Sequence, residues 1–211
     1  MQTFTISVQS MNEIIRWCDY LGTFAFATSG IRLAAAKRFD LFGAFTAGLA
    51  TAVGGGTFRD IMLHQPIFWL RAPSYLLITI IALLLTIFFR KYLTRLNNAV
   101  SIFDAIGLGL FTTVGVACSL SAGYPWWVAP IMGTVTGVFG GIIRDVLLGE
   151  SPLIFRSDFY ALACLIGAFF YLGLKMVGVN QQVVQAGTAL FIVTLRLLAM
   201  HYHWRVPALK P

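Results

Sequence analysis

Long apolar runs alternate with short polar connections along the whole chain. A helix that crosses a membrane needs roughly 20 mostly apolar residues, because the hydrocarbon core is about 30 Å thick. The run from Tyr75 to Phe89 has no charged residue and lacks the two-residue alternation of a membrane β-strand. Seven such stretches occur, at about residues 17–36, 41–63, 71–90, 101–121, 126–148, 158–177 and 182–201. The pattern predicts an all-α membrane protein with seven transmembrane helices, folded as a single membrane domain over residues 1–211.

The amino-acid composition excludes an ordinary soluble domain. Hydrophobic residues make up 58% of the chain and charged residues 11%, whereas about a quarter of the residues in a soluble domain are charged. The net charge is +7, but the cations lie mostly in short segments between apolar runs. This is typical of loops that set membrane topology rather than of a nucleic-acid-binding surface. The predicted partner is therefore the lipid bilayer, and no nucleic acid is expected.

The distribution of Lys and Arg predicts the orientation in the membrane. Residues 1–15 lack the pattern of a cleavable signal peptide, so we expect the first span to be retained. Seven spans put the termini on opposite sides. One side collects eleven cations, namely Arg32, Lys37, Arg38, Arg90, Lys91, Arg95, Arg144, Arg156, Arg196, Arg205 and Lys210, and the other collects four, namely Arg16, Arg59, Arg71 and Lys175. Because positive loops stay in the cytoplasm, we predict an inner-membrane protein with its N-terminus outside and its C-terminus cytoplasmic.

A comparison of the chain with itself reveals an internal repeat. A shift of 85 positions aligns Asp19 with Asp104, and it places one Gly-Gly-x-x-Arg-Asp string, residues 55–60, on a second, residues 140–145. Each copy holds three spans, and because three is odd the second copy crosses the membrane in the opposite direction. Such inverted repeats are typical of transporters and channels. We therefore expect repeat one at about residues 17–90, repeat two at about 101–177 and an additional helix at about 182–201.

Glycines cluster inside the second and fifth spans, at residues 54–56 and 140–141. Each glycine in a helix interior costs about 1 kcal/mol relative to alanine, so the clusters predict a kink or an unwound turn. Carbonyls freed in this way can coordinate a cation at membrane depth. The alternative is close helix packing, which Gly133 and Gly137 fit. The predicted residues of the ion path are Thr51, Gly54, Gly55, Gly56, Thr136, Gly140 and Gly141.

An Arg-Asp pair follows each glycine cluster, and an aspartate lies near the start of the first span of each copy. Ionisable groups within spans are costly, and they usually face a bundle interior or a water-filled cavity. The predicted orientation places Asp19, Arg59 and Asp60 toward the outside and Asp104, Arg144 and Asp145 toward the inside. Two carboxylates and one guanidinium leave each trio with a formal charge of −1. The trios therefore predict cation-attracting vestibules or a gate, and the alternative is a structural ion pair at each helix end.

Motifs of enzyme chemistry are missing from the sequence. No Walker motif or dinucleotide-binding fingerprint occurs, and no Ser-His-Asp or Cys-His arrangement stands out. The three histidines and three cysteines lack metal-ligand spacing. We therefore expect no enzyme, no cofactor and no metal beyond a transported cation.

Two strings carry a family resemblance: Gly-Gly-Gly-Thr-Phe-Arg-Asp at residues 54–60 and Gly-Gly-Ile-Ile-Arg-Asp at 140–145. With the inverted repeat, they resemble the prokaryotic branch of the TRIC (trimeric intracellular cation) channel family, also described as a glycine-transporter-like inner-membrane family. The resemblance spans about residues 17–201. It implies a homotrimer with one pore per protomer, between kinked second and fifth helices, that conducts monovalent cations and favours potassium. The Lys-Glu-Val motif of the animal members, which is linked to phosphoinositide binding, does not occur here.

Three functional hypotheses follow from these patterns. The first is a monovalent cation channel. The second is a secondary transporter of a small zwitterion such as glycine, because broken helices facing each other across a pseudo-two-fold axis also bind transported substrates. The third is a purely structural membrane scaffold. Single-channel current distinguishes the first hypothesis from the second, for which saturable exchange without such current is expected.

Overall fold

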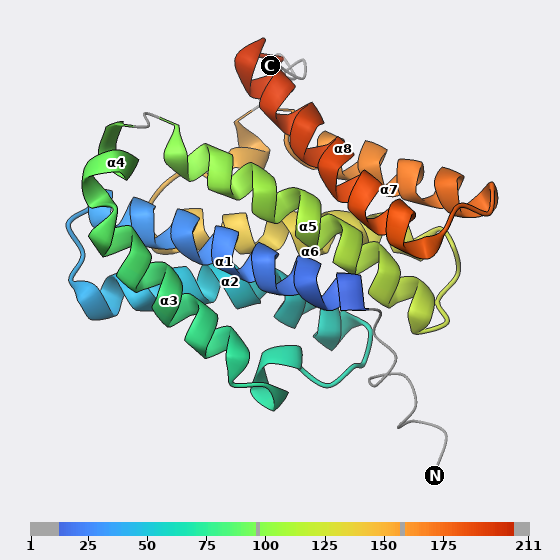
Figure 1. The fold of residues 1–211 in the computed structure, drawn as a ribbon, viewed down its shortest axis with the longest axis horizontal. Coiled ribbons are helices and arrows are strands. Elements are labelled where there is room, and N and C mark those ends of the chain that lie inside the picture. Colours follow the sequence, from blue (N-terminus) through green and yellow to red (C-terminus); the bar gives the residue numbers. More distant parts are fainter. Residues whose placement is uncertain (1–12, 96–97, 157–158, 205–211) are drawn as a thin grey trace, which may run out of the picture.

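The computed structural model describes residues 13–95, 98–156 and 159–204, and these residues are helical apart from short connections (Figure 1). The helices are α1 (Glu13–Ala36), α2 (Leu41–Met62), α3 (Ser74–Phe88), α4 (Arg90–Arg95), α5 (Ala99–Ser121), α6 (Val128–Leu147), α7 (Ala161–Met176) and α8 (Gln181–His201). Two short 3₁₀ helices, η1 (Phe68–Arg71) and η2 (Leu153–Phe155), precede α3 and α7. The predicted all-α fold class is confirmed. Residue 158, where the sixth predicted span begins, and two counted cations, Arg205 and Lys210, lie outside the described residues.

Four of the described helices, α2, α5, α6 and α8, are long and apolar enough to cross a membrane by length and composition. The helices α3 and α7 are shorter, with 15 and 16 residues. The third predicted span, 71–90, is shorter in the structure because α3 begins only at Ser74, after Pro73. Proline lacks a backbone N–H and fixes its φ angle, so it favours the start of a helix over its interior.

The glycine clusters do not unwind their helices. Helix α2 is continuous from Leu41 to Met62, and α6 is continuous from Val128 to Leu147. The expectation of an unwound turn at residues 54–56 and 140–141 is therefore wrong. Tertiary packing can outweigh the unfavourable helix propensity of glycine, and the neighbours of these glycines show what favours the continuous helix.

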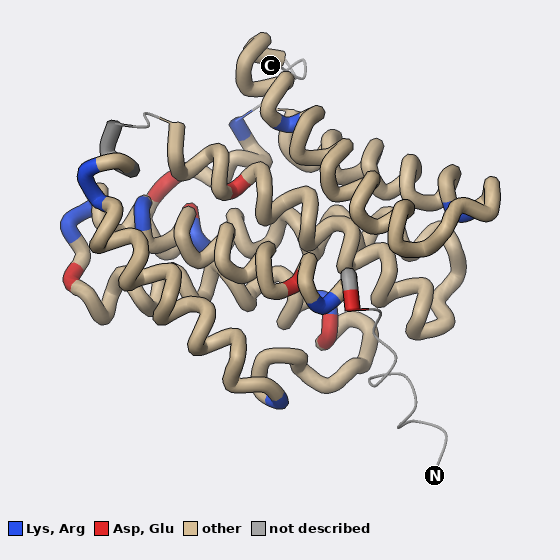
Figure 2. The backbone as a smooth tube through the Cα atoms, viewed as in Figure 1, with Lys and Arg blue, Asp and Glu red and all other residues tan. Residues whose placement is uncertain are grey.

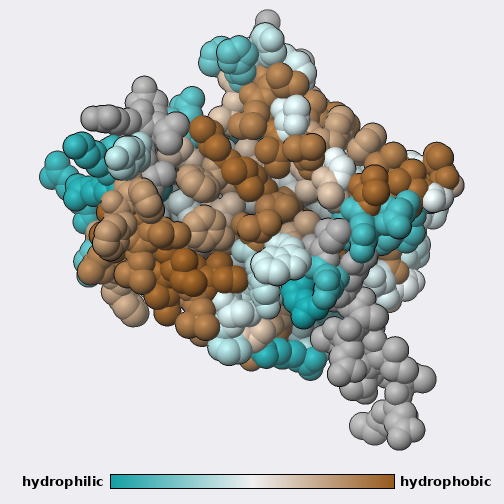
Figure 3. Space-filling model, in the orientation of Figure 1, coloured by the Kyte–Doolittle hydropathy of each residue, from teal (hydrophilic) through white to brown (hydrophobic). Residues whose placement is uncertain are grey.

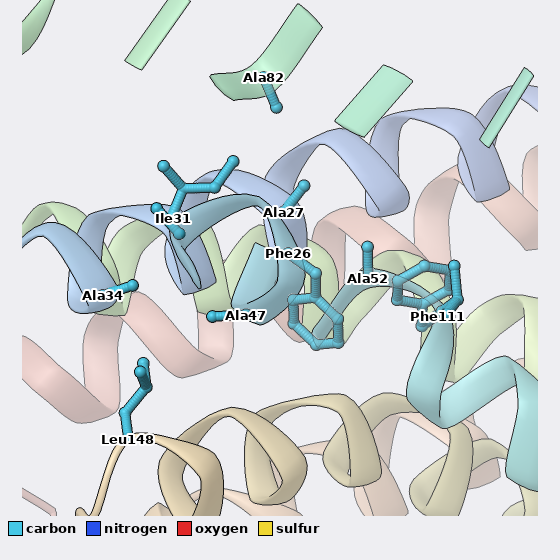
Figure 4. Close-up of a cluster of buried hydrophobic side chains, with 11 residues drawn as sticks. Phe26, Ala27, Ile31, Ala34, Ala47, Ala52, Ala82, Phe111 and Leu148 are labelled. Atoms are coloured by element: carbon cyan, nitrogen blue, oxygen red, sulfur yellow. The ribbon is translucent and has the colours of Figure 1, made fainter. Parts of the chain in front are cut away.

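The four helices α1, α2, α5 and α6 form the centre of the bundle, where α1 packs on α2 and α5, and α6 packs on α2 and α5. Helix α3 covers α1 and α2 on one side, and α7 and α8 cover α5 and α6 on the other (Figure 1). The rings of Phe26 on α1 and Phe111 on α5 meet at the centre, with centroids 5.2 Å apart. Small residues such as Ala27, Ala47 and Ala52 surround them (Figure 4).

Large apolar side chains cover much of the outer surface. In the view of Figure 3, hydrophobic residues spread across the side of the helices. On α3, for example, Phe88 is 87% exposed and Leu77 is 57% exposed. Contiguous apolar surface on this scale is unsuited to water, so the surface is suited to contact with lipid.

Candidate functional site

The two glycine-bearing helices α2 and α6 touch each other through their backbones. A Cβ atom on Gly55 would overlap the carbonyl oxygen of Thr136, and one on Gly140 would overlap the carbonyl oxygen of Thr51. Only a residue without a side chain allows two helix backbones to approach so closely. At Gly55 and Gly140 the glycines therefore serve close packing, the alternative left open by the sequence.

The other glycines of the predicted ion path also face side chains at contact distance. A Cβ atom on Gly54 would overlap Ile143, and one on Gly56 would lie 2.5 Å from a ring carbon of Phe68. A Cβ atom on Gly141 would lie 2.5 Å from the hydroxyl oxygen of Tyr160. These three glycines thus make room for neighbouring side chains.

The two threonines of the predicted ion path lie at equivalent places in the two copies. The hydroxyl of Thr51 donates to the carbonyl of Ala47 at 2.6 Å, and that of Thr136 donates to the carbonyl of Met132 at 2.6 Å. Both hydroxyls are fully buried and engage their own helix. Elsewhere between the same two helices, the rings of Phe58 on α2 and Phe139 on α6 stack with centroids 4.1 Å apart. The centre of the α2–α6 contact is therefore closed by packed groups.

Charged residues gather at opposite ends of the bundle, with uncharged segments between them (Figure 2). At one end lie Asp19, Arg59 and Asp60, all at most 4% exposed. We call them the outer cluster, and the trio at the opposite end the inner cluster, after the orientation that the sequence predicts. Arg59 donates from Nε to Asp60 Oδ1 at 2.8 Å, and its guanidinium carbon lies 5.4 Å from the centre of the Phe68 ring. Asp19 accepts a hydrogen bond from the hydroxyl of Tyr75 at 2.5 Å. The outer Arg–Asp ion pair is thus formed by two consecutive residues of α2.

At the other end lies the inner cluster, formed by Asp104, Arg144 and Asp145, all at most 3% exposed. Arg144 donates from Nε to Asp145 Oδ1 at 2.8 Å, which repeats the outer pair. It also donates from Nη1 to Asp104 Oδ1 at 2.6 Å and to the Ser29 hydroxyl at 2.7 Å. One guanidinium on α6 therefore bonds to α5 and to α1, which the guanidinium at the outer end does not do.

Both clusters share a second layer of hydrogen bonds. In the inner cluster, Asp145 Oδ2 accepts the backbone N–H of Leu153 at 3.1 Å, and the Tyr160 hydroxyl donates to Asp104 at 3.2 Å. In the outer cluster the equivalent acceptor, Asp60 Oδ2, binds the backbone N–H of residue 68, and Tyr75 takes the place of Tyr160. The partners are 8 and 56 residues apart in both copies. The repeat therefore holds at the level of individual hydrogen bonds.

Three buried atoms of the two clusters have no hydrogen-bond partner among the described residues: Asp19 Oδ1, Arg59 Nη1 and Asp104 Oδ2. A buried polar group without a partner is costly. One carboxylate oxygen is thus available at each end of the bundle, and the outer cluster also has an unused guanidinium donor. No group of His, Cys, Asp and Glu side chains within the described ranges is arranged to hold a metal ion.

The structure brings each predicted charged trio together, and it adds residues that the sequence analysis did not select. Tyr75 and Tyr160 are 85 positions apart, so the repeat itself could have pointed to them. Ser29 offers no such signal, because position 114, its equivalent in the second copy, is valine. Only the three-dimensional structure shows Ser29 in the inner cluster.

Comparison with known sequences agrees with the internal repeat, because one family model matches the chain twice. The sequence model of the family described as "Glycine transporter" matches residues 16–91 and again residues 101–176. The inner membrane protein YadS of Escherichia coli K12, from the UPF0126 group, is 39% identical over 198 residues, which cover 92% of this chain and 95% of YadS. The UPF0126 membrane protein YvgT of Bacillus subtilis is 30% identical over 89% of this chain and 92% of its own.

Comparison with solved structures points to the same group. The structure of the TRIC trimeric intracellular cation channel orthologue from Rhodobacter sphaeroides is similar with a TM-score of 0.85 and 32% identity, over 90% of this chain and 99% of that one. A second structure, of a TRIC cation channel studied for conductance, has a TM-score of 0.82 and 34% identity, over 93% of this chain and 97% of that one. The chain is thus an all-helical membrane protein of the channel-like class. It belongs to the prokaryotic branch of the TRIC channel family, which the model described as "Glycine transporter" represents.

Proposed function

We propose that this protein is a cation channel of the inner membrane that favours monovalent cations, potassium among them. The observation that carries the proposal is the pair of buried clusters, in which two carboxylates outnumber one guanidinium at each end. Each cluster keeps one carboxylate oxygen, Asp19 Oδ1 or Asp104 Oδ2, without a hydrogen-bond partner. A negative charge with an available oxygen attracts and coordinates cations. The cation channels among the structural relatives support the same function.

The proposed path lies between α2 and α6 within one protomer, and it connects the two clusters. Of the predicted path residues, Thr51, Gly54, Gly55, Thr136 and Gly140 lie at this helix contact, whereas Gly56 faces Phe68 and Gly141 faces Tyr160. Because Gly55 and Gly140 hold the two backbones together, we infer that the structure is a closed state. Conduction then requires α2 and α6 to separate or to bend at their glycines.

We further propose seven transmembrane helices, namely α1, α2, α3, α5, α6, α7 and α8, with the N-terminus outside and the C-terminus in the cytoplasm. In this arrangement α1 to α3 form repeat one, α5 to α7 form the inverted repeat two, and α8 is the additional helix. A homotrimer is proposed because a structural relative is described as a trimeric channel. In this trimer each protomer keeps its own path.

Ion-substitution recording on the purified protein in planar bilayers tests the function. With a KCl gradient, we expect single-channel steps whose reversal potential lies near the potassium equilibrium potential. Replacing chloride by a large anion should leave that potential nearly unchanged. A chloride-selective current, or no current at any voltage or lipid composition, would contradict the proposal.

A secondary transporter of a small zwitterion such as glycine is the second candidate. In the outer cluster, Arg59 Nη1 and Asp19 Oδ1 are an unused donor and an unused acceptor of opposite charge. Such a pair is suited to a carboxylate and an ammonium group on one molecule. Counterflow of labelled glycine in proteoliposomes distinguishes the candidates, because saturable exchange without single-channel current favours the transporter.

A further inference from the structure

The inner cluster ties three helices together, whereas the Arg–Asp pair of the outer cluster stays within one helix. Arg144 on α6 bonds to Asp104 on α5 and to Ser29 on α1. At the other end, Arg59 pairs with Asp60 on its own helix, and its Nη1 has no hydrogen-bond partner among the described residues. Movement of α6 away from α1 and α5 therefore requires two hydrogen bonds of Arg144 to break, and movement of α2 has no equivalent cost.

We propose that Ser29 is a positioning residue that holds Arg144 in the inner cluster. This restraint makes the inner end of the proposed ion path the gate of the channel. The proposal rests on the proposed function as a cation channel. Ser29 is fully buried, and its hydroxyl accepts from Arg144 at 2.7 Å while donating to the carbonyl of Val100 at 3.0 Å. The two hydrogen bonds fix the orientation of the Ser29 hydroxyl, as is expected of a group that positions another side chain.

The second copy of the repeat shows what happens without this hydroxyl. Position 114 on α5 is equivalent to Ser29, and it holds a valine that is 1% exposed. Val114 belongs to an apolar cluster with Ile15, the residue equivalent to Val100. At the outer end, an apolar contact thus takes the place of the hydroxyl-to-carbonyl bond. The loss of the hydroxyl accompanies the unpartnered Nη1 of Arg59.

A separate contact on the surface supports the same asymmetry. Lys37, after α1, pairs with Glu150, after α6, at 2.5 Å, and Arg156 pairs with Glu150 at 3.0 Å. The equivalent position to Glu150 at the outer end is Gln65, and that to Lys37 is Ala122, so no ion pair of this kind is available there. The inner end therefore has a second link between the copies, independent of Ser29.

The test compares the open-to-closed ratio of single channels in wild type, Ser29→Ala and Val114→Ser. A hydrogen bond to a charged group is worth roughly 1.5 kcal/mol or more, so we expect Ser29→Ala to raise the ratio about tenfold. Val114→Ser supplies a hydroxyl that Arg59 Nη1 can use, and it should lower the ratio. Val114→Ala removes volume without adding a hydroxyl and is the matched control. Reversal potential and unit conductance should remain unchanged in Val114→Ala.

The outcomes separate this inference from the proposed function. If wild type conducts cations, and if Ser29→Ala leaves the ratio within about twofold of wild type while Val114→Ser leaves it within about twofold of Val114→Ala, the inference is overturned and the channel stands. If Ser29→Ala does not fold, Val114→Ser alone decides, and an unchanged ratio overturns the inference. If wild type carries no cation current, the proposed function fails. Amide hydrogen exchange over residues 141–150 then still tests whether Ser29 holds α6 in place. Faster exchange in Ser29→Ala than in wild type supports the inference, and unchanged exchange overturns it.

Discussion

The outer and inner clusters contain the same residue types at equivalent positions, yet they are connected differently. Both have an aspartate bound by a tyrosine and an Arg–Asp pair whose carboxylate accepts a loop N–H. Only Arg144 reaches across to other helices, through Asp104 and Ser29. The difference teaches that a duplicated sequence can preserve charge at both ends while the helices are tied together differently. The bond from α6 to α1 depends on a serine that the other copy replaces with valine, whereas the bond from α6 to α5 uses an aspartate that both copies contain.

The largest effect is expected at the centre, where the two copies should respond alike. In Gly55→Leu and Gly140→Leu the new side chain meets the backbone carbonyl of Thr136 or Thr51. Overpacking of this kind costs roughly 3 kcal/mol or more where backbone must move. We therefore expect both variants to lose folded protein, measured as the monodisperse fraction after extraction in detergent.

Gly173 on α7 offers a matched control for these variants, since nothing lies within 4 Å of a Cβ atom placed there. Gly173→Leu should retain the wild-type yield. If Gly55→Leu and Gly140→Leu also keep that yield and merely lose conductance, the glycines form an open path rather than a packed contact.

The next largest effect should distinguish the two arginines. Arg144→Gln leaves Asp104 and Asp145 buried without their cation, and losing one partner of a buried pair costs roughly 3–5 kcal/mol. Arg59→Gln leaves only one carboxylate, that of Asp60, without its directly bonded cation, so it should lower the free energy of unfolding by less. Thermal unfolding in detergent measures both. Equal losses of stability would show that the additional contacts of Arg144 contribute nothing.

A smaller effect concerns ion flow and tests whether the ends act as vestibules. Asp60→Asn and Asp145→Asn each remove one negative charge from their own end, so they should cause current rectification of opposite sign. The effect should be larger at 0.01 M salt, where the Debye length is about 30 Å, than at 0.1 M, where it is about 10 Å. Current–voltage curves at the two salt concentrations provide the measurement. Reversal potentials and rectification that stay fixed at low salt, with normal protein yield, would leave the carboxylates as structural anchors.

The smallest effect is expected at the half-buried Glu150. The hydrogen bond from Lys37 and that from Arg156 lower the pKa of Glu150. A lowered pKa in the folded state means that the stabilisation is present above the unfolded value of about 4.3 and is lost as the pH falls through the folded pKa. Melting temperatures between neutral and acidic pH should therefore show a small acid-dependent loss that Glu150→Gln lacks. Gln65→Asn, at the equivalent outer position, should leave that loss unchanged, and a wild-type acid loss retained in Glu150→Gln would assign it to other groups.

Much of the fold was predictable because the membrane allows few alternatives. The second span, predicted at 41–63, matches α2 at Leu41–Met62, and the fourth, predicted at 101–121, matches α5 at Ala99–Ser121. A long apolar run must satisfy its own backbone hydrogen bonds, so it forms a helix. Helix starts in polar segments were less predictable. Helix α1 already includes Glu13, the first described residue, which lies four residues before the predicted apolar stretch, because hydrogen bonding rather than hydropathy defines which residues are helical.

The glycine clusters show where reasoning from local propensity failed. Glycine by itself disfavours a helix, so the clusters at residues 54–56 and 140–141 favour a break when only local propensity is considered. In the structure, Gly55 and Gly140 instead let two helices meet backbone to backbone. The choice between a break and a contact depends on what lies opposite each glycine, and no local pattern contains that information.

By itself, the sequence determined that the chain is helical and membrane-embedded, that it contains an internal duplication, and that each copy carries an aspartate and a later Arg-Asp pair at equivalent positions. These properties follow from hydropathy, length and self-similarity, all of which can be read along one chain. Only the tertiary structure decided that Ser29, 115 residues before Arg144, would complete the cluster of the other copy. The physical reason is that helices of the two copies pack on one another, so that side chains distant in sequence share one buried, low-dielectric site where every unpaired polar atom is costly.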